Sequence, residues 1–290
     1  MPGGLRPQWL NRDLLNCRIF NKIFSLRHSS LHQDPLIILG TGYTGRRLYH
    51  QARGAGWQAL ATSRTPEVHL LDILPEYRIL FDLAQPETWE SIPLPAHIIW
   101  CFPATPLSLV QAFFASRPRA SGRIIVMGST SAYGMNCGLI TEQTPLDTEL
   151  PRVQGEEYLR TQLGAVIIRL AGIYGPGRHV LDWIRKGKVR NTSKWVNLLH
   201  VDDASGICLR ALEQAQDGAT YLASDGRPRT WAEIISIASL KWNIPVPPPA
   251  LPQNTGKQIS IHKLLTDLNY TLRFPDLYQA LDRIERDSSA

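Results

Sequence analysis

The sequence predicts an α/β protein built on a doubly wound parallel sheet, and two observations support this fold class. From Pro35 onward, short apolar runs alternate with segments of helical periodicity, as strands alternate with crossover helices. The first apolar run, 36–39, ends in the motif Gly40-x-Gly42-x-x-Gly45, directly before a helical pattern. Such a turn has no side chains where a pyrophosphate approaches the free N–H groups of a helix N-terminus. We therefore expect an NAD(P)-binding Rossmann fold.

Six strands are expected in this domain, each a short apolar run followed by a turn or a helical pattern. The expected strands are 36–39, 58–62, 78–81, 97–102, 123–127 and 165–170. The expected helices are 43–55, 86–92, 107–116 and 152–162. Right-handed crossovers would arrange these elements on both faces of the sheet.

Beyond residue 170 the alternation is less regular. Further strands are expected at 195–199 and 220–222, and further helices at 180–186, 202–214, 231–240, 261–268 and 275–284. We expect residues 34–225 to form the dinucleotide-binding domain, with the insert 172–194 on the substrate side. Residues 226–290 are expected to form a small, mostly helical C-terminal subdomain, and a substrate would lie in the cleft between the two.

Charge is distributed unevenly along the chain. Residues 1–33 carry +4 of the total net charge of +6, so the remaining 257 residues are nearly neutral and nucleic-acid binding is not expected. We interpret 1–33 as a disordered leader or an over-extended translation start. The alternative, an organelle transit peptide, is less favoured because the segment is not Ser-rich. We expect a cytoplasmic protein, with organelle targeting as the alternative.

Other classes are disfavoured by composition. No apolar run reaches about 18 residues, so no membrane span is expected. The four cysteines form no Cys-x-x-Cys pair, so neither a zinc site nor a disulfide framework is expected. A small-molecule ligand is the expected partner, in a monomer or homodimer.

The residues after the second strand indicate which dinucleotide is preferred. An acidic residue there would bond the ribose of NAD, but this chain has Ser63-Arg64. Arg64 could pair with a 2′-phosphate and Ser63 could donate a hydrogen bond to it, so NADP is favoured and NAD is the alternative. Arg64 could instead be a solvated loop residue.

Further motifs follow in a recognisable order. They are Asp82-Leu83, the segment from Ser129 to Gly134 (STSAYG), the segment from Arg169 to Arg178 (RLAGIYGPGR), and the segment from Asn197 to Asp203 (NLLHVDD). With the glycine motif, they resemble the extended or atypical short-chain dehydrogenase/reductases, the NAD-dependent epimerase/dehydratase relatives. Within that group the chain looks most like the nucleoside-diphosphate-sugar epimerase-like branch. The resemblance covers about residues 35–285.

The resemblance implies roles for individual residues. Those implied to bind the cofactor are Gly40, Gly42, Tyr43, Thr44, Gly45, Ser63, Arg64, Asp82, Leu83, Pro103, Ala104 and Pro176. Ser129 matches the family's catalytic Ser/Thr, and Ser131 and Tyr133 are further catalytic candidates, although Tyr133 could simply be a packing residue. Arg178 and His200 are implied to flank the substrate. Alternatively, Arg178 pairs locally and His200 belongs to a helix start.

One feature of the family is missing. Its Tyr-x-x-x-Lys relay exchanges a proton with the substrate while hydride moves to or from the nicotinamide. The match places Glu149 and Val153 at these two positions, and Tyr158 is followed by Gln162 instead of lysine. Either Tyr133, Glu149 or Arg152 serves a different reaction, or the protein binds NADP without redox chemistry, or another register applies to this loop.

We therefore expect an NAD(P)-binding epimerase/dehydratase-like or reductase enzyme acting on a sugar nucleotide or a similar hydroxyl/carbonyl substrate. The alternative is a non-catalytic NADP-binding regulatory or scaffold protein. A structural or nucleic-acid role for the basic leader is a third possibility.

Overall fold

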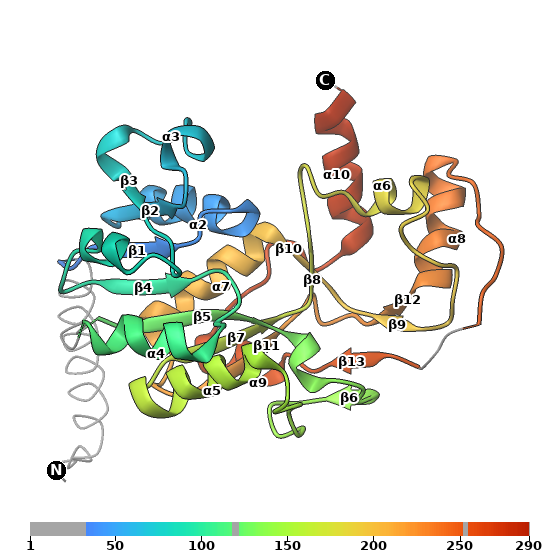
Figure 1. Cartoon of the computed structure of the whole chain (residues 1–290). Coiled ribbons are helices and arrows are strands. Elements are labelled where there is room, and N and C mark those ends of the chain that lie inside the picture. Colours follow the sequence, from blue (N-terminus) through green and yellow to red (C-terminus); the bar gives the residue numbers. More distant parts are fainter. Residues whose placement is uncertain (1–32, 118–121, 252–254, 290) are drawn as a thin grey trace, which may run out of the picture.

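The structure is a computed structural model that describes residues 33–117, 122–251 and 255–289. The expected leader therefore lies outside the described residues, apart from Gln33. Seven parallel strands form the central sheet in the order β3–β2–β1–β4–β5–β7–β11 (Figure 1). Their bounds are β1 Leu36–Leu39, β2 Ala59–Ser63, β3 Arg78–Leu80, β4 His97–Trp100, β5 Ile124–Ser129, β7 Val166–Leu170 and β11 Thr220–Ala223. The doubly wound Rossmann sheet expected from the sequence is confirmed.

Helices cover both faces of this sheet (Figure 1). The helices α2 (Tyr43–Gly54) and α7 (Val201–Gln214) pack together on one face, and α4 (Leu107–Ala115) and α5 (Pro151–Leu163) on the other. Successive residues of β1 alternate between two buried apolar clusters: Leu36 and Ile38 belong to one, Ile37 and Leu39 to the other. A strand with a core on each side needs apolar residues throughout, which explains its unbroken apolar run.

The remaining strands form small pairs outside the sheet. They are β6 (Gly138–Ile140) with β13 (Lys257–Ile259), β8 (Gly172–Tyr174) with β10 (Leu198–His200), and β9 (Trp195–Val196) with β12 (Arg229–Thr230). The expected strand 195–199 is thus two short strands with different partners, and the expected strand 220–222 is the seventh strand of the main sheet. The sequence did not indicate β6, β8, β12 or β13, because strands of two or three residues carry too little periodicity to recognise.

One short helix adjoins the sheet, and four helices besides α7 follow β8. These are α3 (Pro66–His69), then α6 (Val180–Arg185), α8 (Trp231–Trp242), α9 (His262–Leu268) and α10 (Leu277–Ser289), with 3₁₀ turns at Pro75–Tyr77, Pro86–Ser91 and Thr130–Tyr133. The expected helix 86–92 is therefore the 3₁₀ turn Pro86–Ser91. In the part of the chain that the structure describes, no helix has the length and apolarity needed to cross a membrane.

The helices of the C-terminal part pack into two different apolar clusters. Apolar side chains of α6, α8 and α10 form their own buried cluster. These three helices lie together beside the sheet (Figure 1). By contrast, Leu264 and Leu268 of α9 belong to the main cluster under α7. This further cluster is thus built mainly from α6 in the insert after β7 and from α8 and α10, with Tyr174 of β8 and Leu198 of β10.

Candidate functional site

The glycine loop between β1 and α2 leaves room for a phosphate group. Gly40 has φ +89°, and a Cβ there would lie 2.7 Å from Cδ1 of Phe102. A Cβ on Gly45 would lie 2.4 Å from the carbonyl oxygen of Gly40, so the first turn of α2 can pack against the glycine loop only because residue 45 has no side chain. A Cβ on Gly42 would have no atom within 4 Å. The open space at Gly42 is what a close approach of pyrophosphate to backbone requires.

Hydrogen bonds to β2 fix the conformation of this loop. Thr62 Oγ1 accepts from the N–H of Gly40 at 2.9 Å, and Thr41 Oγ1 accepts from the N–H of Thr62 at 3.0 Å. Gly42 is the N-cap of α2 and has no side chain with which to cap it. The N–H groups of the first turn are therefore available to an anionic ligand.

A cavity of about 590 Å³ opens beside the loop, between the ends of β1, β2 and β3. Its lining residues are Gly40, Thr41, Gly42, Tyr43, Arg46, Thr62, Ser63, Arg64, His69, Phe81, Asp82, Leu83, Cys101 and Phe102. Of the residues implied to bind a cofactor, the structure brings seven together here: Gly40, Gly42, Tyr43, Ser63, Arg64, Asp82 and Leu83. We call it the first cavity.

Arg64 is the exposed cation of this cavity. Among the described residues it has no ion pair, whereas Arg46 pairs with Asp72 and with the carbonyl of His69. Ser63 Oγ accepts from the N–H of Thr65 at 3.1 Å, which leaves its hydroxyl hydrogen free to donate. Both groups are therefore available to a ligand at the end of β2.

A second cavity, of about 540 Å³, adjoins the first, and the two share Cys101 and Phe102. Its other lining residues are Thr44, Pro103, Met127, Gly128, Ser129, Thr130, Ser131, Arg152, Leu170, Ala171, Gly172, Ile173, Arg178 and Lys257. It lies at the ends of β5 and β7 and beside the start of α5. Thr44, Pro103, Ser129, Ser131 and Arg178 are residues expected from the sequence. Lys257 was missed, because it belongs to β13, which the sequence did not indicate.

Ser129 and Tyr133 have different surroundings although only four residues separate them. Ser129 ends β5 and its Oγ accepts from the N–H of Ser131 at 3.1 Å, so both serines stay at the second cavity. Tyr133 is completely buried and lines neither cavity. Its ring lies 5.6 Å from the guanidinium of Arg169, and burial raises the pKa of its hydroxyl. The structure thus gives Tyr133 the packing position that was the alternative to a catalytic one.

The positions matched to the missing relay do not face the cavity. Glu149 is exposed before α5, and Val153 is buried. Two α5 residues on the side of β5 are Arg152, which lines the second cavity, and Glu156, whose carboxylate oxygens would lie 3.1 Å from a Cβ on Gly128. Arg152 and Glu156 are four residues apart, the spacing of the family's tyrosine and lysine.

Glu156 is completely buried and links two arginines. Its Oε1 accepts from Arg152 Nε at 3.2 Å, and its Oε2 lies 3.5 Å from Arg169 Nε. Arg169 also donates to Glu157 at 3.0 Å. Burial raises the pKa of Glu156, and the two guanidiniums oppose that shift. The side of α5 that faces β5 therefore carries an ion-pair network.

His200 lies in the interior at the start of α7. Its Nδ1 accepts from the N–H of Asp202, and its ring stacks on that of Phe274 with centroids 3.7 Å apart. Burial lowers its pKa to about 4, so the ring is neutral at pH 7. His200 lines neither cavity, and the helix-start alternative describes its position.

Two contacts link Tyr43, beside the glycine loop, to Arg178 and Pro176. Arg178 is exposed at the second cavity, with its guanidinium 5.9 Å from the ring of Tyr43. Tyr43 donates to the carbonyl of Pro176 at 3.1 Å. Pro176 is exposed and Ala104 is buried, and neither lines the two cavities.

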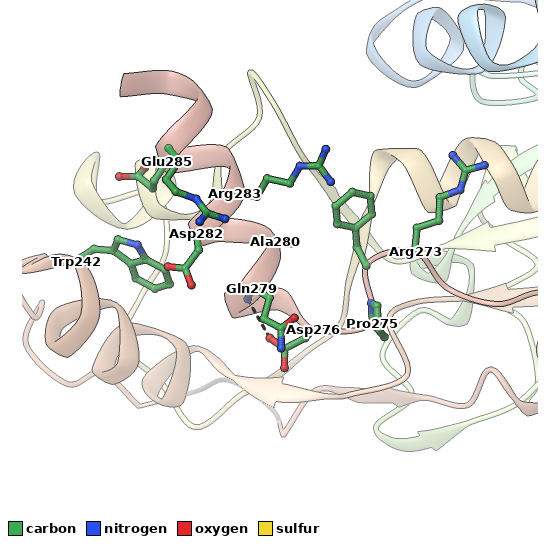
Figure 2. Close-up of a pocket in the computed structure, with 11 residues that line it drawn as sticks. Trp242, Arg273, Pro275, Asp276, Gln279, Ala280, Asp282, Arg283 and Glu285 are labelled. Atoms are coloured by element: carbon green, nitrogen blue, oxygen red, sulfur yellow. Dashed lines mark hydrogen bonds between the residues drawn. The ribbon is translucent and has the colours of Figure 1, made fainter. Parts of the chain in front are cut away.

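A larger cavity, of about 840 Å³, lies beside α10 and shares no residue with the other two (Figure 2). Several of its acidic side chains have partners: Asp282 pairs with Lys241, and Asp276 with Arg227. None of its lining residues belongs to the glycine loop, and Ser129 does not line it. Within the described residues, no group of three or more His, Cys, Asp or Glu is placed to hold a metal ion.

No protein-family model matches the chain. A curated relative, the protein YeeZ of Escherichia coli (strain K12), is 30% identical over 165 residues, which cover 53% of this chain and 59% of YeeZ. The match thus spans less than two thirds of that protein.

Solved structures match nearly the whole chain. A protein from Methylobacillus flagellatus, provisionally named an NAD-dependent epimerase/dehydratase, has a TM-score of 0.71 at 22% identity, covering 89% of this chain and 99% of that one. A nucleoside-diphosphate-sugar epimerase from Pseudomonas aeruginosa has a TM-score of 0.71 at 18% identity, covering 88% and 98%. MoeE5, solved with UDP-glucose and NAD, has a TM-score of 0.69 at 17% identity, covering 88% and 100%. The chain therefore has the fold of the NAD-dependent epimerase/dehydratase-like proteins and nucleoside-diphosphate-sugar epimerases, and the resemblance read from its motifs is confirmed at the level of the fold.

Proposed function

We propose that this chain binds NADP and acts on a sugar nucleotide or a similar hydroxyl/carbonyl substrate, as an atypical short-chain dehydrogenase/reductase. The observation that carries the proposal is the glycine loop opening onto two adjoining cavities at the carboxyl ends of the parallel strands. Ligands of doubly wound sheets bind at this edge. MoeE5, which has the same fold, was solved with NAD and a nucleotide sugar.

The preference for NADP is supported by the residues at the end of β2. Arg64 is exposed and without an ion pair among the described residues, and Ser63 keeps a free hydroxyl hydrogen. A guanidinium can hold a phosphate through two parallel hydrogen bonds. With the adenosine half in the first cavity, these groups would bind the 2′-phosphate.

Catalysis would take place in the second cavity. A nicotinamide ring bound there supplies hydride transfer. The Ser129 hydroxyl can donate to a substrate oxygen, because its oxygen already accepts from Ser131. A guanidinium is a poor general base, so Arg152 would bind or orient a substrate. Tyr133 is buried and lines neither cavity, which leaves it no part in proton transfer.

The second candidate function is a non-catalytic NADP-binding regulatory or scaffold role. The Arg152–Glu156 pair favours it, because neither side chain replaces a tyrosine phenol held beside a lysine ammonium. In this case the cofactor cavity would be intact while turnover is absent.

A turnover assay separates the two functions. The full chain would be saturated with NADPH or NADP, and A340 would be followed with UDP-glucose, UDP-glucuronate and a panel of small carbonyl and alcohol substrates. Product analysis is run alongside, because an epimerase regenerates its cofactor in each cycle. Conversion that Ser129→Ala reduces supports the enzyme. Cofactor binding with no conversion of any compound supports the second function.

We also propose the division into a dinucleotide-binding domain, 34–225, and a C-terminal subdomain, 226–290. The separate apolar cluster of α6, α8 and α10 supports it, while α9 packs against the larger domain. The insert 172–194 would then contribute α6 and Arg178 to the substrate side.

A further inference from the structure

The second cavity is positively charged. Arg152, Arg178 and Lys257 line it, and its described lining includes no Asp or Glu. These cations come from three distant parts of the chain: the start of α5, the loop before α6, and β13. Cations gathered in one cavity repel one another, and a bound anion offsets this repulsion.

Neighbouring groups of the protein neutralise only part of this charge. Arg152 shares the single carboxylate of Glu156 with Arg169. Arg178 lies over the ring of Tyr43 and has no carboxylate partner among the described residues. The charge that remains faces the cavity.

One hydrogen bond and the pairing of β13 fix the position of Lys257, and most of its N–H donors have no protein partner among the described residues. The pairing of β13 with β6 sets Lys257 beside Gly138, and its Nζ donates to the carbonyl oxygen of Gly134 at 2.7 Å. An ammonium group has three N–H donors, so two remain for a ligand. Burial and the nearby Lys194 lower the pKa of Lys257, as expected where no carboxylate balances its charge.

We propose that the second cavity takes a substrate with a carboxylate or phosphate at its reacting end, and that Lys257, with Arg152 beside the Ser129–Ser131 turn, determines this specificity. The proposal rests on the proposed function only in treating this cavity as the substrate side. The ammonium of Lys257 would bond the anion while Ser129 bonds the neighbouring oxygen of the same molecule. Because charge-assisted hydrogen bonds are the strong ones, losing this ammonium should weaken binding markedly.

The test uses the full chain, first saturated with NADPH and then titrated with inorganic phosphate or with malonate at constant ionic strength. Calorimetry should show saturable 1:1 binding of at least one of these anions, and the better ligand identifies phosphate or carboxylate as the preferred group. Lys257→Gln should weaken that binding by about tenfold or more. The matched control is Lys241→Gln, which removes a positive charge paired with Asp282 on α10 and should leave binding unchanged.

Three results would overturn the proposal: no saturable binding of either anion, equal binding by wild type and Lys257→Gln, or competition between the anion and NADPH. Competition would mean that the anion occupies the cofactor's phosphate position. If NADPH itself does not bind, the proposed function fails, and the same titration of the free protein still decides the role of Lys257.

Discussion

Arg152 Nε lies 3.2 Å from Glu156 Oε1, one helical turn along α5. These two residues have the spacing of the Tyr-x-x-x-Lys relay and lie on the side of the helix that faces β5. An arginine and a buried glutamate thus occupy this face, whereas the match to the family's relay falls on Glu149 and Val153. The glycine loop and the first cavity are present in this fold, and the side of α5 toward β5 carries an ion pair.

Substituting Gly42 should separate cofactor binding from folding. A Cβ on Gly42 meets no protein atom, so Gly42→Ala should fold with an unchanged Tm. The added methyl would occupy the space for pyrophosphate, and NADPH binding should weaken by about tenfold or more as backbone hydrogen bonds to the phosphates are lost. Titration by NADPH fluorescence measures this effect.

Gly54→Ala is the matched control for Gly42→Ala. Gly54 ends the same helix and also has open space around its Cβ position. Replacing it should leave NADPH affinity unchanged and add up to about 1 kcal/mol of stability. An equal loss of affinity in both variants would argue against a phosphate at Gly42.

Replacing Arg64 should change the choice between the two cofactors. Arg64→Ala should weaken NADPH binding by about ten- to a hundredfold and leave NADH nearly unaffected, because only NADPH carries the 2′-phosphate. Arg53→Ala, a change outside the first cavity, is the control. Equal losses for NADPH and NADH would reject the role assigned to Arg64.

Breaking the buried ion-pair network should destabilise the fold. Glu156→Ala leaves Arg169 buried with only the partly exposed Glu157 beside it, and should cost about 3–5 kcal/mol in the free energy of unfolding. Glu157→Ala removes a more exposed partner and should cost less. Urea denaturation of the two variants measures the difference, and the reverse order would contradict the account of the network.

Protonation of His200 should make the protein less stable in mild acid. Its pKa is about 4 in the folded state and 6.5 for the free side chain. Between these values the unfolded state binds the extra proton, so stability should fall as the pH drops from 6.5 to 4, by up to about 3 kcal/mol from this residue.

The variant His200→Asn isolates this contribution. Asparagine keeps a cap acceptor for the N–H of Asp202 and does not titrate. The variant should lose less stability than wild type between pH 6.5 and 4, measured by urea denaturation at each pH. Identical pH dependence in the two proteins would show that His200 is not buried in its neutral form.

Sequence reasoning predicted the sheet and the first cavity because local chemistry determines both. The apolar runs, the glycine spacing and Ser63-Arg64 are contiguous signals, and residues at the ends of parallel strands meet at one edge of the sheet. The same reasoning correctly offered the helix-start explanation for His200, whose side chain accepts from the N–H of Asp202.

The second cavity could not be predicted from local sequence patterns, because its residues are brought together by long-range pairing. Lys257 lines the same cavity as Ser129 because two three-residue strands more than a hundred residues apart pair with each other. The Arg152–Glu156 pair was similarly hidden, because tertiary packing decides which residues of α5 face β5. Burial of Tyr133 likewise follows from tertiary packing around Arg169.

Equilibrium binding of NADPH to the full chain tests the central claim most directly. Titration followed by fluorescence, with calorimetry for stoichiometry, should give one saturable site per chain and tighter binding of NADPH than of NADH. Absence of saturable binding of either dinucleotide would contradict the account.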